Sequence, residues 1–280
     1  MNLVNKIKGV VLGTALGLTA VTCQAQNANL VNGLISYYDF NEGSGNVARD
    51  AFRLQNLPVS NSWADGKANS AYNPNRHFYD IGLNLSGQSG ASINFWLRRT
   101  GVWGTYENII QTGNTDGNFY IDTADISGRK TVFSYYSGAA SDFNLNFPTD
   151  GIWHMLTLTL ENGSEKGYLD SIQQFSSSVN FSFSANNITL FGGAGNGSPG
   201  DNAMNVDELG IWNRVLTSDE VSSLYDNGVG LIYTGRHGGI GIESLGDFVV
   251  ATEPSTLGLT ALGGATFLAM RRKRKKSIAL

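Results

Sequence analysis

The chain has 280 residues with a single cysteine, and its formal net charge is −4. The charge is unevenly distributed, because residues 26–252 hold 11 Lys and Arg against 22 Asp and Glu, whereas residues 271–276 are all basic. Because residues 26–252 are this acidic, nucleic acid is excluded as a partner, since phosphate binding requires a basic surface. It is compatible with cations and with neutral polymers.

Residues 1–25 have the features of a secretory signal peptide. Lys6 and Lys8 precede a short apolar run, and Cys23 and Ala25 are among the residues that close the segment. A basic region, an apolar region and small residues in this order are typical of signal peptides, and the apolar run is too short to span a bilayer. We predict cleavage after Ala25. The exported chain then has no cysteine and must rely on a hydrophobic core for its stability.

Residues 26–233 contain many short segments in which apolar and polar residues alternate. In one of them Ile93, Phe95 and Leu97 alternate with other residues, and residues 152–160 show the same pattern. A period of two predicts strands with one face in a core. The other predicted strands are 34–40, 107–112, 118–122, 130–136, 166–170, 172–178, 187–191 and 204–212. Gly, Asn, Asp and Ser clusters separate them, which favours a β-sandwich or a barrel.

One short helix is predicted at residues 217–228. Thr217 and Glu220 have the spacing of a capping box, and Gly228 suits the left-handed position past the helix end. The apolar residues that share one face of this helix are Val221, Leu224 and Tyr225. We expect the helix to dock on the sandwich through that face. Residues 234–252 are rich in Gly. They could contain a last edge strand before a linker, and we interpret them as mostly linker.

Four segments together resemble the laminin-G-like, concanavalin A-like jelly-roll domains of bacterial secreted proteins. They are residues 33–45, 92–97, 151–158 with 167–170, and 205–216. In order, they resemble the family's first strand with its acidic turn, a central strand, the Trp-His strand with the strand after it, and the closing strand. Ser171 stands where the family has Gly. The resemblance implies an all-β jelly-roll β-sandwich with one docked helix.

The end of the chain, residues 253–276, resembles the PEP-CTERM sorting signals of Gram-negative bacteria. Glu253, Pro254 and Ser255 begin it, and an apolar segment and a basic cluster follow. Thr252 stands where the family has its first Pro. The resemblance implies that an exosortase-type membrane peptidase processes the chain at these residues.

The apolar segment 255–270 is predicted to form a short membrane helix. As a helix it measures about 24 Å, which is short of the roughly 30 Å of a membrane core. The basic cluster 271–276 places the C-terminus in the cytoplasm by the positive-inside rule. We expect an exported protein of the outer cell envelope or the extracellular matrix, anchored transiently. A permanent single-pass anchor is the alternative.

Two pairs of residues are candidates for ligand binding. Asp39 and Asp207 are candidate calcium ligands, because a sandwich can bring the first and closing strands together and calcium prefers oxygen ligands. The alternative is that both are ordinary surface or capping carboxylates. Trp103 and Tyr106, in a Gly-rich segment, are candidate stacking platforms for sugars, although core packing explains aromatic residues equally well.

The first functional expectation is a non-enzymatic module that binds polysaccharide or a cell-surface glycan, with calcium as its candidate cofactor. A structural matrix protein without a ligand site is the alternative. A glycanase is disfavoured, because the closely spaced carboxylates that glycosidases need are missing. The adjacent Asp207 and Glu208 should point to opposite faces of a strand. His154 has apolar neighbours on its own face and is interpreted as a core histidine.

Overall fold

The computed structural model describes residues 30–52, 56–60, 62–74, 79–102, 107–111, 119–126, 129–136, 145–161, 163–178, 187–190, 203–226, 230–233 and 248–250. The predicted signal peptide and the predicted sorting signal lie outside these ranges. Of the predicted linker, residues 234–252, only residues 248–250 are described. Within the described ranges, no helix is long and apolar enough to cross a membrane.

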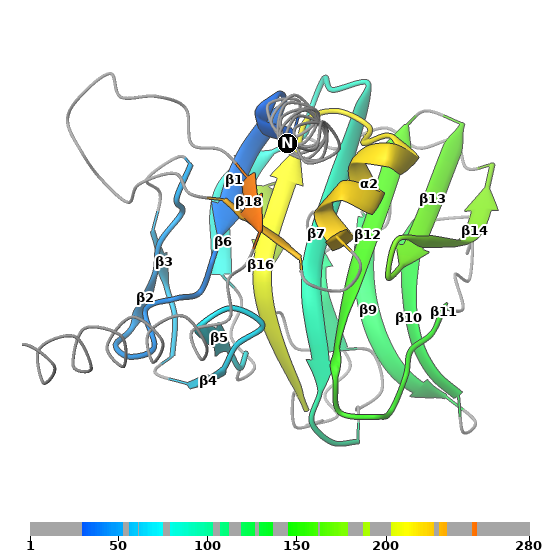
Figure 1. The fold of residues 1–280 in the computed structure, drawn as a ribbon. Helices are drawn as coiled ribbons and strands as arrows, with labels where there is room; N and C mark the ends of the chain where they lie inside the picture. The colour runs from blue at the N-terminus through cyan, green and yellow to red at the C-terminus, as the bar shows by residue number, and fades with distance from the viewer. Residues whose placement is uncertain are drawn as a thin grey trace, which may run out of the picture. The chain divides into compact units, whose positions relative to one another are not determined.

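The larger sheet has eight strands among the described residues. Seven follow the order β14-β13-β12-β7-β16-β5-β4, and β1 also pairs with β16 (Figure 1). The strands are β1 (Leu34–Tyr38), β4 (Trp63–Asp65), β5 (Ser70–Tyr72), β7 (Gly90–Arg99), β12 (Trp153–Glu161), β13 (Ser164–Leu169), β14 (Ile172–Ser177) and β16 (Met204–Trp212). Strands far apart in sequence lie side by side, such as β7 and β16, which is expected of a jelly roll.

The smaller sheet has the strand order β11-β10-β9-β8-β15-β6 in the described part of the chain. Its strands are β6 (Tyr79–Asn84), β8 (Glu107–Gln111), β9 (Phe119–Ile126), β10 (Arg129–Tyr136), β11 (Leu145–Asn146) and β15 (Asn187–Leu190). Two short ribbons complete the described strands, β2 (Val47–Ala48) with β3 (Leu57–Pro58) and β17 (Leu231–Tyr233) with β18 (Phe248–Val250). The predicted all-β sandwich is confirmed.

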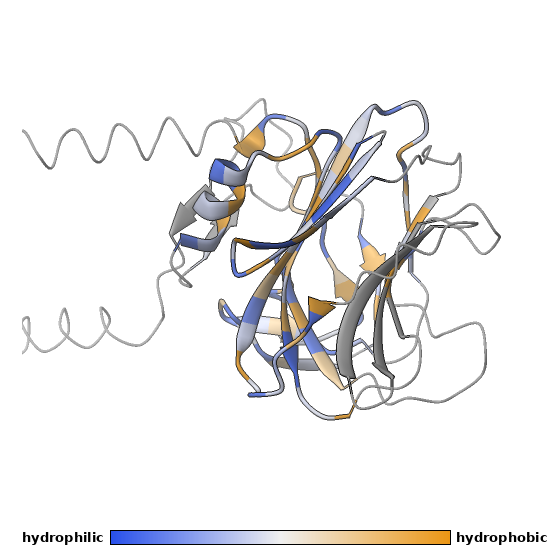
Figure 2. Cartoon of the chain, turned by 90° about the vertical axis from the view of Figure 1, so that its right-hand side faces the viewer, coloured by the Kyte–Doolittle hydropathy of each residue, from blue (hydrophilic) through white to orange (hydrophobic). Residues whose placement is uncertain are grey.

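One hydrophobic cluster fills the space between the two sheets. Its members include Ile93, Phe95 and Leu97 from the larger sheet and Ile81, Ile110 and Leu190 from the smaller one. The alternation predicted for β7 is therefore confirmed. Seen from the side in Figure 2, hydrophobic and hydrophilic residues alternate along strands of the larger sheet. Such alternation turns one side of a strand toward the core.

The other face of the larger sheet carries a second hydrophobic cluster, which the helix covers. Trp96 and Trp212 from the sheet pack there with Val221 and Leu224 of α2 (Ser218–Tyr225). The Trp96 ring stacks on the ring of Tyr225 at a centroid distance of 5.8 Å. All nine residues of β16 are consequently buried, so this strand has no solvent-exposed face.

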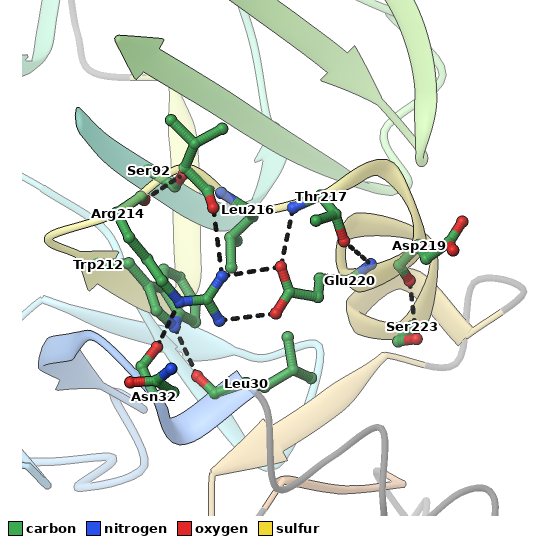
Figure 3. A network of polar contacts seen from close by, with 11 residues as sticks. Leu30, Asn32, Ser92, Trp212, Arg214, Leu216, Thr217, Asp219, Glu220 and Ser223 are labelled. Atoms are coloured by element: carbon green, nitrogen blue, oxygen red, sulfur yellow. Dashed lines mark hydrogen bonds and ion pairs between the residues drawn. The ribbon is translucent and has the colours of Figure 1, made fainter. Parts of the chain in front are cut away.

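The start of α2 is fixed by a polar network around Glu220 (Figure 3). The Thr217 side chain accepts from the Glu220 amide at 3.2 Å, and the Glu220 carboxylate accepts from the Thr217 amide at 2.8 Å. Arg214 donates to both Glu220 oxygens, at 2.7 and 2.8 Å. The predicted capping box is confirmed, and the ion pair ties the helix to the end of β16.

The helix ends earlier than the sequence predicts. The helix ends at Tyr225, and Asp226 adopts the left-handed conformation after it, with a φ of 41°, whereas Gly228 lies outside the described residues. The Asp226 amide donates to the Ser222 carbonyl. Asp tolerates this region better than most side chains because its short polar group can form local hydrogen bonds. The predicted range 217–228 therefore extends beyond the end of the helix.

Replacement of Glu220 is expected to destabilise the fold in a pH-dependent way. Burial alone would raise the pKa of Glu220, but the bonds to Arg214 and Thr217 hold this pKa below its ordinary value. The resulting stability is present above the ordinary pKa of 4.5 and is lost as pH falls through the lowered value. We expect Glu220→Gln to lower the free energy of unfolding by about 1–2 kcal/mol at pH 7.

Urea denaturation of the full chain at pH 7 and pH 3 measures this difference. Wild type and Glu220→Gln should converge at the lower pH. A loss of equal size at both pH values would show that the charge of Glu220 does not contribute.

Candidate functional site

An open pocket of about 510 Å³ lies beside the hairpin formed by β4 and β5. Its lining residues are Gly43, Trp63, Ala64, Asp65, Asn69, Ser70 and Arg98. They come from the turn after β1, from the hairpin and from β7. The pocket thus combines one large aromatic side chain with several polar groups.

The ring of Trp63 is fixed at the boundary between the core and the pocket. It packs against the inter-sheet cluster and meets the Tyr72 ring edge-on at a centroid distance of 5.7 Å. Its indole Nε1 donates to the Gly45 carbonyl at 2.9 Å. The side chain is half-buried, so part of it remains available to a ligand.

Arg98 supplies a positive charge that is also fixed in place. Its Nη2 donates to the Asp65 carbonyl at 2.9 Å. Its guanidinium carbon lies 4.9 Å from the centroid of the Trp153 ring, which is a cation–π contact. The pocket therefore contains the guanidinium of Arg98, fixed by these two contacts, and the exposed side chain of Asp65.

Two hydrogen bonds of Ser70 join the turn after β1 to the hairpin. Its hydroxyl donates to the Phe40 carbonyl at 2.7 Å, and its amide donates to the Asn41 side chain at 3.3 Å. The hairpin turn closes with a bond from the Gly66 amide to the Asn69 carbonyl. A Cβ at residue 66 would lie 2.4 Å from the Ser70 carbonyl oxygen, so only glycine fits there.

Asp207 holds the hairpin turn. One carboxylate oxygen accepts from the amides of Lys67 and Ala68 at 2.8 and 3.1 Å, and the other accepts from the Glu208 amide at 2.9 Å. Asp207 is 0% exposed. Burial raises the pKa of its carboxyl well above the ordinary value, and the negative charge of Asp39 adds to this effect.

The prediction that Asp207 and Glu208 point to opposite faces is wrong. Val206 and Leu209 both belong to the inter-sheet cluster, so the strand gains one residue between them. The register against β7 shifts between Asp207 and Gly210, and Glu208 has a φ of 52°. This β-bulge places both carboxyls on the outer face.

Glu208 is buried beside the outer hydrophobic cluster. The Tyr37 hydroxyl donates to its Oε2, while its Oε1 is buried and has no hydrogen-bond partner among the described residues. Burial raises the pKa of the Glu208 carboxyl well above its ordinary value, and the neighbouring charge of Asp207 raises it further. The carboxyl pair lies beneath the surface, not among the residues that line the pocket.

The two predicted calcium ligands lie close enough for the charge of Asp39 to affect Asp207. Asp39 follows β1, and its Oδ1 accepts from the Asn41 amide at 3.3 Å. Among the described residues there is no group of three or more His, Cys, Asp or Glu side chains that could hold a metal ion. Calcium binding stays a prediction from the sequence.

His154 is buried between two carboxylates. Its Nδ1 lies 2.6 Å from Asp170, and its Nε2 lies 3.2 Å from Asp150. The Phe147 ring packs edge-on against the imidazole. This environment agrees with a satisfied core histidine. A second open pocket, of about 660 Å³, lies beyond Asp170 and is lined also by residues of α2.

The predicted stacking residues Trp103 and Tyr106 lie outside the described residues, as do Ala25, Glu253, Pro254 and Ser255. The pocket residues Trp63, Asp65, Asn69 and Arg98 are not among the site residues predicted from the sequence. A signal was present, because Asp65-Gly66 is a strong hairpin-turn dipeptide and a tryptophan stands just before it.

Comparison with protein families gives one match. A laminin-G-type family model, described as the concanavalin A-like lectin/glucanases superfamily, matches residues 73–222, which is more than half of the chain. No curated protein sequence matches significantly.

Solved structures share the fold at low sequence identity. A sialidase of Trypanosoma rangeli in complex with 2,3-difluoro-KDN has a TM-score of 0.54 and 14% identity, over 69% of this chain and 32% of the sialidase. The binding domain of Paraclostridial Mosquitocidal Protein 1 has a TM-score of 0.55 and 17% identity, over 71% of this chain and 53% of that one. The chain spans about a third of the sialidase. These likenesses concern the fold alone.

Alanine at residue 66 is expected to disturb the hairpin that forms the pocket. We expect Gly66→Ala to cost about 2 kcal/mol of stability, because its Cβ meets backbone atoms that cannot move aside independently. Gly101→Ala is the matched control, since its Cβ meets only the Cβ of Ala203, at 3.0 Å. Thermal unfolding should show the larger shift for Gly66→Ala, and equal shifts would contradict this account.

Proposed function

Because the chain belongs to the concanavalin A-like lectin/glucanases superfamily, we propose that it is a carbohydrate-binding module that binds its ligand without cleaving it. The ligand class is a polysaccharide or a surface glycoconjugate. The observation that carries the proposal is the pocket beside the β4–β5 hairpin, where the Trp63 ring stands among fixed polar groups.

The chemistry of this pocket suits a sugar. A pyranose or furanose ring has a C–H face, which packs on an aromatic ring, and a rim of hydroxyl groups, which need both donors and acceptors. Trp63 offers the aromatic surface. Arg98 offers donors, while Asp65 and Asn69 offer acceptors at the rim. Because Arg98 and Trp63 are held by other contacts, a ligand would lose little affinity to ordering them.

Binding is proposed rather than hydrolysis because of where the carboxyls lie. Glycosidases of the common type place two carboxyl groups on either side of the scissile bond. Asp65 is the one carboxylate among the described residues that line this pocket. Asp207 and Glu208 are a close pair, but they are 0% and 2% exposed. A substrate would not reach them without displacing the hairpin turn.

Export and sorting belong to the same proposal and rest on sequence features. Residues 1–25 would direct the chain out of the cytoplasm, and residues 253–276 would deliver it to an exosortase-type peptidase at the membrane. The module would then act in the outer envelope or the extracellular matrix. A structural matrix protein without a ligand site is the competing function.

A binding panel with the full chain tests the carbohydrate proposal. The probes are dextran, xylan and arabinan, which are neutral, and alginate, which is anionic. We expect at least one neutral polymer to be retained, and Trp63→Ala to weaken its binding at least about tenfold, since losing an anchoring aromatic residue typically costs about 2 kcal/mol. Affinity electrophoresis measures both results.

Two further variants make the result specific to the pocket. Trp63→Phe keeps an aromatic ring and should retain part of the affinity. Trp103→Ala tests the platform that the sequence suggests, and binding lost only in this variant would move the site away from the β4–β5 pocket. If none of the four polymers is retained, the structural matrix protein becomes the better function.

Calcium is tested separately by thermal unfolding. If calcium binds the folded chain through Asp39, millimolar calcium should raise the unfolding temperature and a chelator should reverse the shift, because a ligand of the native state stabilises it. Asp39→Asn should abolish the calcium shift. An unfolding temperature that is the same with calcium and with chelator would reject calcium as a cofactor.

A further inference from the structure

We propose that Asp207 is the positioning residue of the sugar pocket. It holds the turn of the β4–β5 hairpin through two backbone amides and so sets the places of the pocket residues on either side of that turn. This inference rests on the proposed function of the pocket. It assigns Asp207 a role that needs no metal ion and no contact with the ligand.

The other attachments of the hairpin lie at its base and on either side of its turn. Strands β4 and β5 have three residues each, and one register pair, Val206 with Tyr72, joins β5 to β16. At the base of the hairpin, the Asn73 side chain donates to the Met204 carbonyl at 3.1 Å and to Asn205 at 2.9 Å. These bonds fix the base, and Ser70 and Asp65, on either side of the turn, are bonded to Phe40 and Arg98.

The turn itself is held against the outer face of the larger sheet. The Asp207 carboxylate receives the amides of Lys67 and Ala68. The Lys67 ammonium lies 4.8 Å from the centroid of the Trp96 ring. Trp96 is directly opposite Asp207 in the β7–β16 register, so both contacts hold the turn at one place on the sheet.

The pocket residues lie directly beside the two amides that Asp207 binds. Asp65 comes two residues before Lys67, and its carbonyl receives the Arg98 guanidinium. Asn69 comes directly after Ala68 and lines the pocket. A turn that moves away from Asp207 would therefore carry Asp65 and Asn69 with it and would release Arg98.

Asp50 provides a matched control within the same chain. It is 1% exposed, and its carboxylate accepts from the amides of Tyr37 and Phe52 at 3.1 and 2.8 Å and from the Ser36 hydroxyl at 2.7 Å. The two aspartates thus make the same kind of buried contact. Asp50 serves a different segment and does not line the pocket.

The test compares Asp207→Ala with Asp50→Ala in the full-length chain. Hydrogen exchange of the Lys67 and Ala68 amides and the NMR signal of the Trp63 indole N–H, assigned with Trp63→Phe, report on the turn and the pocket wall. We expect Asp207→Ala to speed exchange of both amides at least about tenfold beyond any change in global stability, and to shift the indole signal. Asp50→Ala should leave both readouts as in wild type.

Binding provides the second readout, with whichever of dextran, xylan, arabinan or alginate the wild-type chain retains. Compared well below their unfolding temperatures, Asp207→Ala should lose about tenfold in affinity or more, and Asp50→Ala should not. Equal losses in the two variants would mean that Asp207 acts only through stability and would overturn the proposal.

The remaining outcomes separate this inference from the proposed function. If wild type retains none of the four polymers, the proposed function fails, while the exchange and indole readouts still decide whether Asp207 positions the turn. If Asp207→Ala does not fold, the same measurement is made on the wild-type chain. Slow exchange of the Lys67 and Ala68 amides, together with a scalar coupling from each amide to the Asp207 carboxyl carbon, supports the proposal. Unprotected amides in wild type overturn it.

Discussion

The bulge at Asp207 and Glu208 is the constraint on which the larger sheet depends. On one edge of β16, Val206 pairs with β5 and residues from Leu209 onward pair with β1, whereas β7 pairs along the other edge. The bulge lies where one partner strand gives way to the next. An extra residue bends a strand and increases its twist, so the bulge changes the course of β16 between its two antiparallel partners on this edge, β5 and β1.

This solution has an energetic cost that the surroundings only partly offset. Removing a carboxylate from water costs several kcal/mol, and here two adjacent carboxyls are buried on one face. Asp207 accepts from three amide donors, whereas Glu208 accepts from the Tyr37 hydroxyl on one oxygen and, in the described part of the chain, has no partner on the other. Strained and costly positions tend to persist where function needs them, and this one lies directly beneath the hairpin turn beside the pocket.

Sequence patterns predicted the features that are set by residues close together in the sequence, such as the core face of a strand and the start of a helix. The alternation of Ile93, Phe95 and Leu97 identified the core face of β7, and the Thr217–Glu220 spacing identified the helix start. The bulge escaped prediction because a period of two assumes an unbroken strand, and only the partners of β16 impose the extra residue. The pocket was not predicted for a related reason. The turn after β1 and the hairpin are separated in sequence, and contacts of the folded chain, such as the bonds of Ser70 and Gly45, bring them together.

The position of the pocket also limits what the family can say about the ligand. The family match begins at residue 73, whereas Trp63, Asp65 and Asn69 precede it, so most of the pocket lies outside the matched region. Charge then narrows the ligand class. With 11 basic and 22 acidic residues, residues 26–252 repel polyanions at long range, and the single guanidinium of Arg98 acts only locally. An uncharged polysaccharide approaches such a surface without this penalty, which is why the neutral polymers are the expected ligands.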